Sequence, residues 1–259
     1  MLKTKKRIVI ANWKMNPQTA DDAWSLFSGI KKTASKLRFV HTIICPPATY
    51  LLDLSDSYRG KNISFGAQNI FWKEGGSFTG EISARQIHDA GARFVLVGHS
   101  ERRALGETNE NVWLKVKAAL KERLHVILCI GESERDDGGD YLHFLREQLE
   151  SALNEVKAAD LNRIIVAYDP IWAIGKTGED AITPDKLHEM VLFIKRVLVE
   201  RYNKTAIDTP IIYGGSVEKE NAQGLLERGV VAGFLVGHAS LDATEFSSIL
   251  KIANETKAL

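Results

Sequence analysis

The sequence lacks most of the features that direct a chain to a membrane or an oxidising compartment. Its 259 residues include only two cysteines, Cys45 and Cys129, and both lie in apolar runs rather than in paired spacings. We therefore interpret them as reduced core thiols and expect a cytoplasmic protein. No apolar run approaches the roughly 20 residues that span a bilayer, and Ile8–Ile10 is too short for the apolar part of a signal peptide.

The sequence also lacks an excess of charge of one sign and the histidine or cysteine spacings that bind metals. The chain carries 34 basic and 33 acidic residues, a formal net charge of +1, so long-range charge does not favour nucleic acid or a membrane surface as a partner. No His-x-His, His-Glu-x-x-His or Cys-x-x-Cys spacing is present, and we expect no metal centre. A nucleotide triphosphate site is disfavoured too, because no Gly-Lys-Ser/Thr sequence of the phosphate-binding-loop type occurs.

Apolar runs of strand character alternate with helical patterns along the chain. Strands are predicted at about residues 8–11, 42–45, 63–66, 94–97, 125–130, 163–168, 210–213 and 233–236. Each run is continuously apolar, as is typical of a parallel sheet covered on both faces. Eight strands and eight helices in strict alternation predict a single (β/α)8 barrel domain over residues 1–259. An open doubly wound sheet is disfavoured, since the first turn reads Asn-Trp-Lys and not a glycine fingerprint.

The strand at residues 163–168 ends in a carboxylate, Asp169, followed by Pro170. The proline fixes its own φ and disfavours helical backbone at Asp169, so the acid is held on extended chain. In an eight-fold barrel the chemistry gathers where the strands end, and a carboxylate opposite an imidazole suggests proton transfer beside a polarised carbonyl. The groups expected on that face are Lys14, His99, Glu101 and Asp169.

Plainer interpretations remain open for these groups. Asp169 alone could belong to an ordinary turn, and Glu101 with Arg102 and Arg103 could be a solvated charge cluster. His99 stands out because it follows four apolar residues at a strand end. The other histidines with no such setting are interpreted as structural: His41, His88, His125, His143 and His188.

Glycines follow three of the predicted strands and form a second candidate site. Gly175, Gly214 with Gly215, and Gly237 offer backbone N–H groups that can approach an anion closely. Barrels of this kind often bind a phosphate in the loops after strands seven and eight. The sequence therefore predicts a phosphate-bearing ligand.

Seven segments in the same order resemble the triosephosphate isomerase family along nearly the whole chain. They are Ala11–Asn16, Gly66–Asn69, Phe78–Ser83, Val97–Arg103, Cys129–Glu132, Tyr168 with Pro170–Gly175, and Tyr213–Ser216 together with Gly237 and Ala239–Leu241. The resemblance implies a cofactor-free interconversion of dihydroxyacetone phosphate and glyceraldehyde 3-phosphate through an enediolate. Asp169 would move the proton, as a carboxylate does in that family, and neutral His99 would polarise the carbonyl oxygens. Lys14 would supply positive charge, with Asn12 supporting the oxygens and Glu101 orienting its neighbours.

The resemblance also implies a phosphate site and a lid. Backbone N–H groups of Gly175, Ser216, Gly237 and His238 would surround the phosphate. A loop that excludes water would begin at Pro170, and Tyr213 and Ser216 would hold its closed form. The expected lid residues and lid contacts are Pro170, Ile171, Trp172, Ala173, Ile174 and Tyr213.

Three departures from the family pattern affect the site. The family has Glu at the position of Asp169, a lid about two residues shorter than residues 175–183, and usually a second Gly where His238 stands. Losing one methylene withdraws the carboxylate by roughly 1 Å, and a misplacement of that size can cost on the order of 10²-fold in rate. The backbone of His238 can still donate if its φ is negative, whereas a positive φ would cost about 1 kcal/mol or more.

Two alternative functions and one partner remain to be weighed. A Schiff-base aldolase would use Lys14 at the carbonyl, and a barrel impaired by Asp169 would persist as a phosphate-ligand binding or scaffold protein. The connection from Asn69 to Gly80 is long and carries Phe71, Trp72 and Phe78. Because the resembling family inserts this loop into a second subunit, we expect a homodimer formed through residues 71–80.

Overall fold

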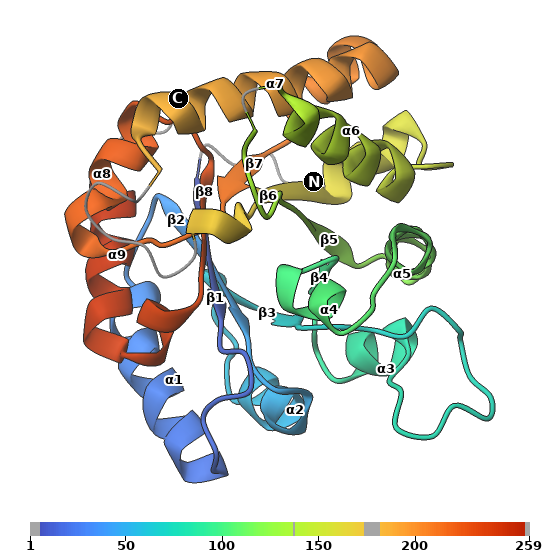
Figure 1. The fold of residues 1–259 in the computed structure, drawn as a ribbon. Helices are drawn as coiled ribbons and strands as arrows, with labels where there is room; N and C mark the ends of the chain where they lie inside the picture. Colours follow the sequence, from blue (N-terminus) through green and yellow to red (C-terminus); the bar gives the residue numbers. More distant parts are fainter. Residues whose placement is uncertain (1–5, 137, 174–181, 257–259) are drawn as a thin grey trace.

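Eight parallel strands close into a barrel in the computed structural model, which describes residues 6–136, 138–173 and 182–256 (Figure 1). The strands are β1 (Arg7–Asn12), β2 (Val40–Cys45), β3 (Ile63–Ala67), β4 (Phe94–Val97), β5 (His125–Ile130), β6 (Ile164–Tyr168), β7 (Ile211–Tyr213) and β8 (Gly233–Val236). They lie side by side in chain order, and β8 pairs with β1 to close the sheet. The predicted (β/α)8 barrel is therefore confirmed.

Both faces of the strands are buried, which explains why the sequence shows continuous apolar runs. Alternate side chains of a strand point to opposite faces, so Val95 packs outward against the helices and Leu96 fills the barrel interior. The interior contains Cys45 and Cys129 among aliphatic side chains. Both thiols are free and buried, as predicted.

Helices surround the barrel and shield the outer faces of the strands (Figure 1). The α-helices are α1 (Ala20–Ala34), α2 (Ala48–Asp56), α3 (Ala84–Asp89), α4 (Ser100–Ala104), α5 (Asn109–Lys121), α6 (Asp140–Ala152), α7 (Pro184–Tyr202), α8 (Lys219–Glu227) and α9 (Ala243–Glu255). Short 3-10 segments are η1 (Ala158–Arg163), η2 (Ile171–Ala173), η4 (Asn203–Ala206) and η5 (His238–Leu241). Several helices begin at a hydroxyl cap: Thr19, Ser83, Thr108 and Thr183 each accept a hydrogen bond from a backbone N–H of the first turn.

The predicted strict alternation of strands and helices is wrong after β4, where two helices follow. His99 caps α4, and its five residues bury no side chain, so no apolar periodicity could reveal the helix. Gly106, with φ of 95°, turns the chain between α4 and α5, and Thr108 then starts α5.

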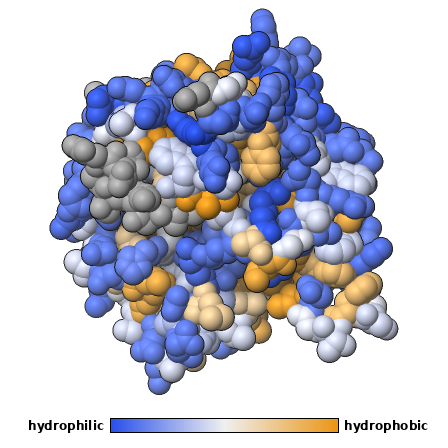
Figure 2. All heavy atoms as spheres, in the orientation of Figure 1, coloured by the Kyte–Doolittle hydropathy of each residue, from blue (hydrophilic) through white to orange (hydrophobic). Residues whose placement is uncertain are grey.

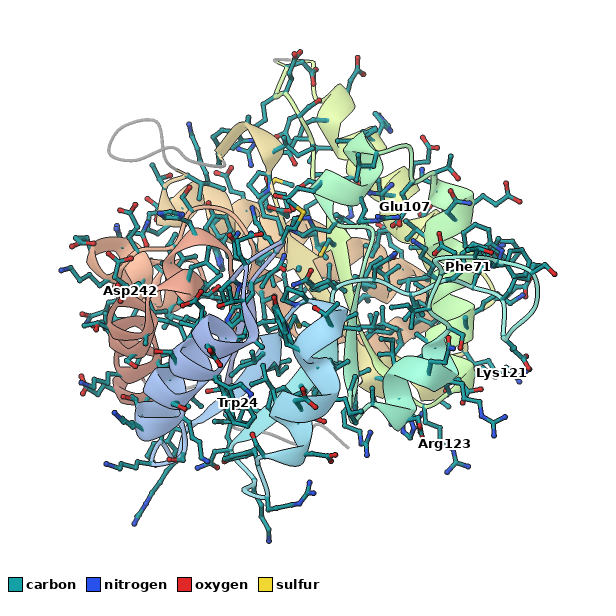
Figure 3. The ribbon with its side chains drawn as sticks, turned by 90° about the horizontal axis from the view of Figure 1, so that it is seen from below. Trp24, Phe71, Glu107, Lys121, Arg123 and Asp242 are labelled. Carbon is teal, nitrogen blue, oxygen red and sulfur yellow. The ribbon has the colours of Figure 1, made fainter. Side chains whose placement is uncertain are left out.

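The connection between β3 and α3 projects from the side of the barrel (Figure 1). Its aromatic side chains contact one another, with ring centroids 4.2 Å apart for Phe71 and Trp72 and 4.8 Å apart for Phe71 and Phe78. Figure 3 shows Phe71 at the opposite side of the molecule from Asp242, the N-cap of α9. Most of the surface in the view of Figure 2 is hydrophilic, and in the described part of the chain no helix is long and apolar enough to cross a membrane.

Candidate active site

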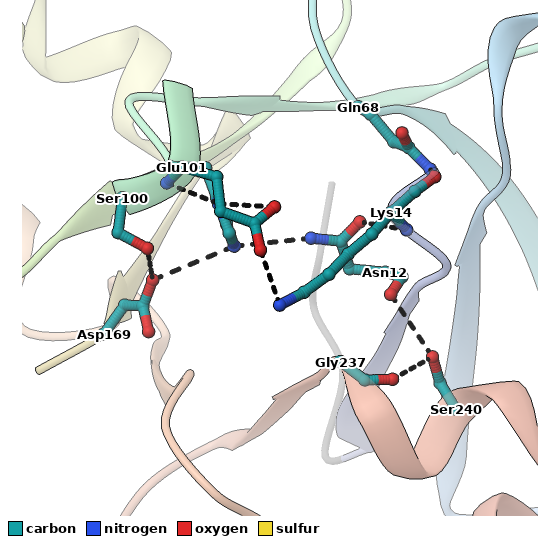
Figure 4. Close-up of polar contacts among 9 residues, drawn as sticks. Asn12, Lys14, Gln68, Ser100, Glu101, Asp169, Gly237 and Ser240 are labelled. Carbon is teal, nitrogen blue, oxygen red and sulfur yellow. Dashed lines mark hydrogen bonds and ion pairs between the residues drawn. The ribbon is translucent and has the colours of Figure 1, made fainter. Parts of the chain in front are cut away.

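A cavity of about 660 Å³ lies at the end of the barrel where the strands finish. Asn12, Lys14, His99 and Asp169 line it, so four of the expected catalytic residues come together from β1, β4 and β6. Glu101, the fifth, reaches the same group through an ion pair with Lys14 (Figure 4). The carboxyl ends of the strands therefore form the candidate site, as the sequence indicates.

Asp169 is almost completely buried at the end of β6. Its backbone N–H donates to the carbonyl of Ile130 at 2.8 Å, and its Oδ2 accepts a hydrogen bond of 3.0 Å from the hydroxyl of Ser100. Burial raises the pKa of the Asp169 carboxyl, while His99, Ser100 and Lys14 act in the opposite direction. A carboxyl with a raised pKa is a stronger base in its ionised form, which suits it to remove a proton from carbon.

His99 presents its ring to Asp169 with a defined tautomer. The Nδ1 atom accepts a hydrogen bond of 3.2 Å from the backbone N–H of Glu101, because His99 is the N-cap of α4. In a neutral imidazole the proton is then on Nε2, which lies 3.8 Å from Oδ2 of Asp169. His99 is therefore placed to donate a hydrogen bond from Nε2 into the cavity.

The peptide of Gly98, directly before His99, is held at both ends. Its N–H donates to Oε1 of buried Glu107 at 3.0 Å, and its carbonyl accepts from Nε of Arg103 at 2.9 Å. The φ of Gly98 is 76°, and a Cβ added there would lie 3.0 Å from the carbonyl oxygen of Cys129. Only glycine fits this position without strain, and its fixed backbone aims the imidazole of His99.

Lys14 occupies an unusual backbone conformation beside the cavity. Its φ is 53°, its N–H donates to Oδ1 of Asn12 at 3.1 Å, and its carbonyl accepts from Nε2 of Gln68 at 2.8 Å. These two hydrogen bonds hold a left-handed conformation that a residue with a side chain rarely adopts. The Nζ atom lies 2.7 Å from Oε1 of Glu101 (Figure 4).

The amide of Asn12 and the ring of His99 point their donors at the same place. Oδ1 of Asn12 is already used by Lys14, so its Nδ2 is the atom that faces Nε2 of His99 at 3.4 Å. Two N–H groups thus converge without an acceptor between them. A carbonyl or enediolate oxygen placed there would accept from both and would lie near the positive charge of Lys14, which is the arrangement of an oxyanion-binding site.

Most of the expected phosphate residues line the same cavity. Ser216, Gly237 and His238 line it, whereas Gly175 falls outside the described residues. The φ of His238 is not positive, so its side chain adds no left-handed strain there. A Cβ on Gly237 would lie 3.1 Å from Cε of Lys14, and the absence of a side chain at Gly237 leaves room for the lysine.

The first lid residues are anchored to the barrel after Asp169. Ile171 donates its N–H to the carbonyl of Glu132 at 2.9 Å, and Nε1 of Trp172 donates to Oε1 of Glu132 at 2.8 Å. The carbonyl of buried Ala173 accepts a hydrogen bond of 3.0 Å from Ser216. Pro170 precedes this anchored turn.

The remaining expected lid residue and lid contact are Ile174 and Tyr213. Ile174 lies outside the described residues, as does the rest of residues 174–181. The hydroxyl of Tyr213 is buried without a hydrogen-bond partner among the described residues.

Four further residues, for which no role was predicted, support the site. Ser100 holds Asp169, and Gln68 holds the backbone of Lys14. The hydroxyl of buried Ser240 lies 3.3 Å from the carbonyl oxygen of Asn12 and 2.6 Å from that of Gly237 (Figure 4). Arg135 donates to Tyr168 and Glu132 and lies over the ring of Trp172. Ser100 and Gln68 are polar residues next to predicted strand ends, and this position could have indicated that they belong to the site.

A carboxylate, an imidazole and an ammonium at the carboxyl ends of the strands define a (β/α)8 barrel enzyme with an acid–base site. A family model described as triosephosphate isomerase matches residues 7–253. The chain belongs to the triosephosphate isomerase family.

Individual relatives agree over nearly the full chain. The chain is 42% identical over 250 residues to a triosephosphate isomerase from Citrifermentans bemidjiense, with 95% of this chain and 98% of that protein covered. It is 42% identical, with the same coverage, to one from Coprinopsis cinerea. The crystal structure of triosephosphate isomerase from Bartonella henselae is similar with a TM-score of 0.83 and 33% identity, covering 96% of this chain and 100% of that one.

Proposed function

We propose that this protein interconverts dihydroxyacetone phosphate and D-glyceraldehyde 3-phosphate. The observation that carries the proposal is the convergence of buried Asp169 with the donors of His99 and Asn12 in one cavity. Membership of the family and the names of the relatives support the same reaction.

The proposed reaction moves one proton between neighbouring carbons. The ionised carboxylate of Asp169 takes the proton from the carbon next to the substrate carbonyl, and the electrons of that C–H bond form the enediolate. Nε2–H of His99 and Nδ2–H of Asn12 donate to the oxygen on which negative charge develops, and Lys14 adds a fixed positive charge. Asp169 then returns the proton to the adjacent carbon. No electrons are exchanged with an outside partner, so the step needs no redox cofactor.

A coupled assay on the purified protein tests this function. Glyceraldehyde 3-phosphate should be converted to dihydroxyacetone phosphate, which a glycerol-phosphate dehydrogenase then reduces with loss of NADH absorbance. In deuterium oxide, product formed through an enediolate should carry deuterium on the carbon that was reprotonated. A protein that binds the phosphate ester but converts none of it would instead fit the binding or scaffold alternative, and trapping by borohydride would indicate the Schiff-base alternative at Lys14.

A homodimer is the second part of the proposal. Large apolar side chains are exposed on this chain, and Phe78 of the predicted interface is one of them: Met15 is 84% exposed, Leu105 77% and Phe78 41%. Met15 directly follows Lys14, so a partner that covers this region would also shield the backbone of the candidate site. Exposed apolar groups at the edge of a site are typical of a surface that becomes buried on assembly.

A further inference from the structure

Among the residues that the structure describes, the walls of the active-site cavity carry more acidic than basic side chains. Two lysines, Lys14 and Lys219, line the cavity. The carboxylates that line it are Asp169, Glu218, Glu220 and Glu245. A phosphate ester with two negative charges would therefore meet more carboxylates than lysines among the described residues of the cavity.

Both lysines are also partly neutralised by nearby carboxylates. Nζ of Lys14 lies 2.7 Å from Glu101, and Nζ of Lys219 lies 3.6 Å from Glu220. Backbone N–H groups near Gly237 can bind an anion, but they add no net charge. A further cationic group at this cavity would therefore strengthen the binding of a dianion.

Of the described residues that line the cavity, the two histidines, His99 and His238, are the other groups that can carry positive charge. His238 directly follows Gly237, where an added Cβ would lie 3.6 Å from Nζ of Lys14, so its amide lies at the same end of the cavity as the ammonium. The imidazole is exposed and forms no hydrogen bond or ion pair with the described residues. His99, the other histidine in the cavity, is held by Glu101 and faces Asp169 instead.

We propose that the side chain of His238, in its protonated form, binds the phosphate group of the substrate and makes anion binding stronger as pH falls. This inference rests on the proposed function for the identity of the ligand. It differs from a role of the His238 backbone alone, since a backbone N–H group does not titrate between pH 6 and pH 8. The titratable and charged groups that face this end of the cavity are Lys14, Glu101, Asp169, Glu218, Lys219, Glu220 and Glu245.

Sulfate is the appropriate probe because it stays a dianion between pH 5.5 and 8.5, whereas a phosphate ester loses a proton within that range. Sulfate affinity of the full chain is measured by titration calorimetry at pH 6 and pH 8 at constant ionic strength. We expect about three- to tenfold tighter binding at pH 6, as for one added charge-assisted hydrogen bond. The part of the change that arises from Asp169 is present in every variant below and cancels in the comparison.

Three variants separate the side chain of His238 from its backbone. His238→Gln should lose most of the difference between pH 6 and pH 8, because glutamine donates without a charge. His238→Lys should bind sulfate at pH 8 about as tightly as the unmodified protein does at pH 6. His143→Gln, a change at an exposed histidine of α6, should behave like the unmodified protein.

An unchanged pH dependence in His238→Gln, or no sulfate binding by the unmodified protein, would overturn the inference. Circular dichroism of each variant shows whether it is folded. If His238→Gln is not folded, His238→Lys still provides an independent result. Isomerase turnover of the unmodified protein is measured in parallel. Turnover without a role of His238 in sulfate binding rejects only this inference, whereas absence of turnover rejects the proposed function.

Discussion

The hydroxyl of Ser100 donates a hydrogen bond of 3.0 Å to Oδ2 of Asp169. Ser100 is the first residue of α4, and His99 is the cap of the same helix, so one short element positions both the acid and the imidazole. The start of α4 therefore sets the distance between the two groups that the proposed reaction requires. Changes at this point should affect proton transfer more than folding.

Replacing Asp169 by Asn tests whether this carboxylate is the base. An amide cannot accept the proton, so turnover should fall by at least about 10³-fold, in line with the contribution of a positioned general base. Steady-state kinetics provide the measurement, with Asp53→Asn on the exposed side of α2 as the control. Turnover of Asp169→Asn close to that of the unmodified protein would place the base elsewhere.

Replacing Asp169 by Glu tests whether reach limits the reaction. A Cβ on Gly214 would lie 3.2 Å from Cβ of Asp169, so the wall behind the acid is tight and a longer side chain must extend into the cavity. We expect the turnover number to rise by up to about 10²-fold with a nearly constant Michaelis constant, because only the transition state gains. A lower turnover number would show that the site is adapted to the shorter acid.

Replacing Ser100 by Ala should shift the pH profile of the enzyme. The hydroxyl of Ser100 stabilises the ionised carboxylate, so its loss raises the pKa of Asp169 further. The acid limb of kcat/KM should then move to higher pH by up to about one pH unit, since the base is protonated over a wider range. Ser100→Thr keeps a hydroxyl and should restore the profile. A limb that does not move in Ser100→Ala would argue against this hydrogen bond in solution.

Two histidines at the end of the barrel away from the candidate site should make the stability of the protein depend on pH. Burial lowers the pKa of both His41 and His125 to about 4. In the unfolded chain the same two histidines bind protons below about pH 6.5. Because the unfolded state gains protons at a higher pH than the folded state, the free energy of unfolding falls as pH drops from about 6.5 to 4. The loss is at most about 3 kcal/mol for His41 and less for the more exposed His125.

Urea unfolding at pH 7 and pH 5 provides this measurement. The double variant His41→Asn and His125→Asn should lose part of the difference in unfolding free energy between the two pH values. His143→Gln, at an exposed site, should retain it. The interpretation fails if the double variant is as sensitive to acid as the unmodified protein.

Introducing a charge at Phe78 should weaken the proposed dimer. Phe78 is 41% exposed and belongs to the aromatic cluster between β3 and α3, so Phe78→Asp would place a carboxylate in the proposed interface at little cost to a single chain. Sedimentation velocity at micromolar concentration should show a shift towards monomer. Phe144→Asp, at a ring of similar exposure on α6, should not change the sedimentation coefficient. A fully active monomer of the unmodified protein would contradict the proposal.

The sequence predicted the strands well because burial on both faces leaves an unmistakable apolar run. Phe94–Val97 and His125–Ile130 have the predicted bounds. It could not predict α4, whose five residues bury no side chain. Local patterns reveal helices through periodic burial, and this helix has none.

Site residues were predictable where they follow a strand directly and not where they act across the chain. Lys14, His99 and Asp169 each follow a strand end, and all three line the cavity. Gln68 and Ser240 support Lys14 and Asn12 from positions 54 and 228 residues away in sequence. Such contacts depend on how the barrel closes, which no short pattern contains.

The two buried thiols make this chain a convenient host for covalent probes. Burial raises the pKa of Cys45 and of Cys129, and reagents that attack thiolates find few of them in the folded protein. A cysteine introduced at Lys219, on the rim of the cavity, would be the reactive one and could carry a fluorophore or a spin label. Ligand entry could then be followed by spectroscopy without first removing the native cysteines.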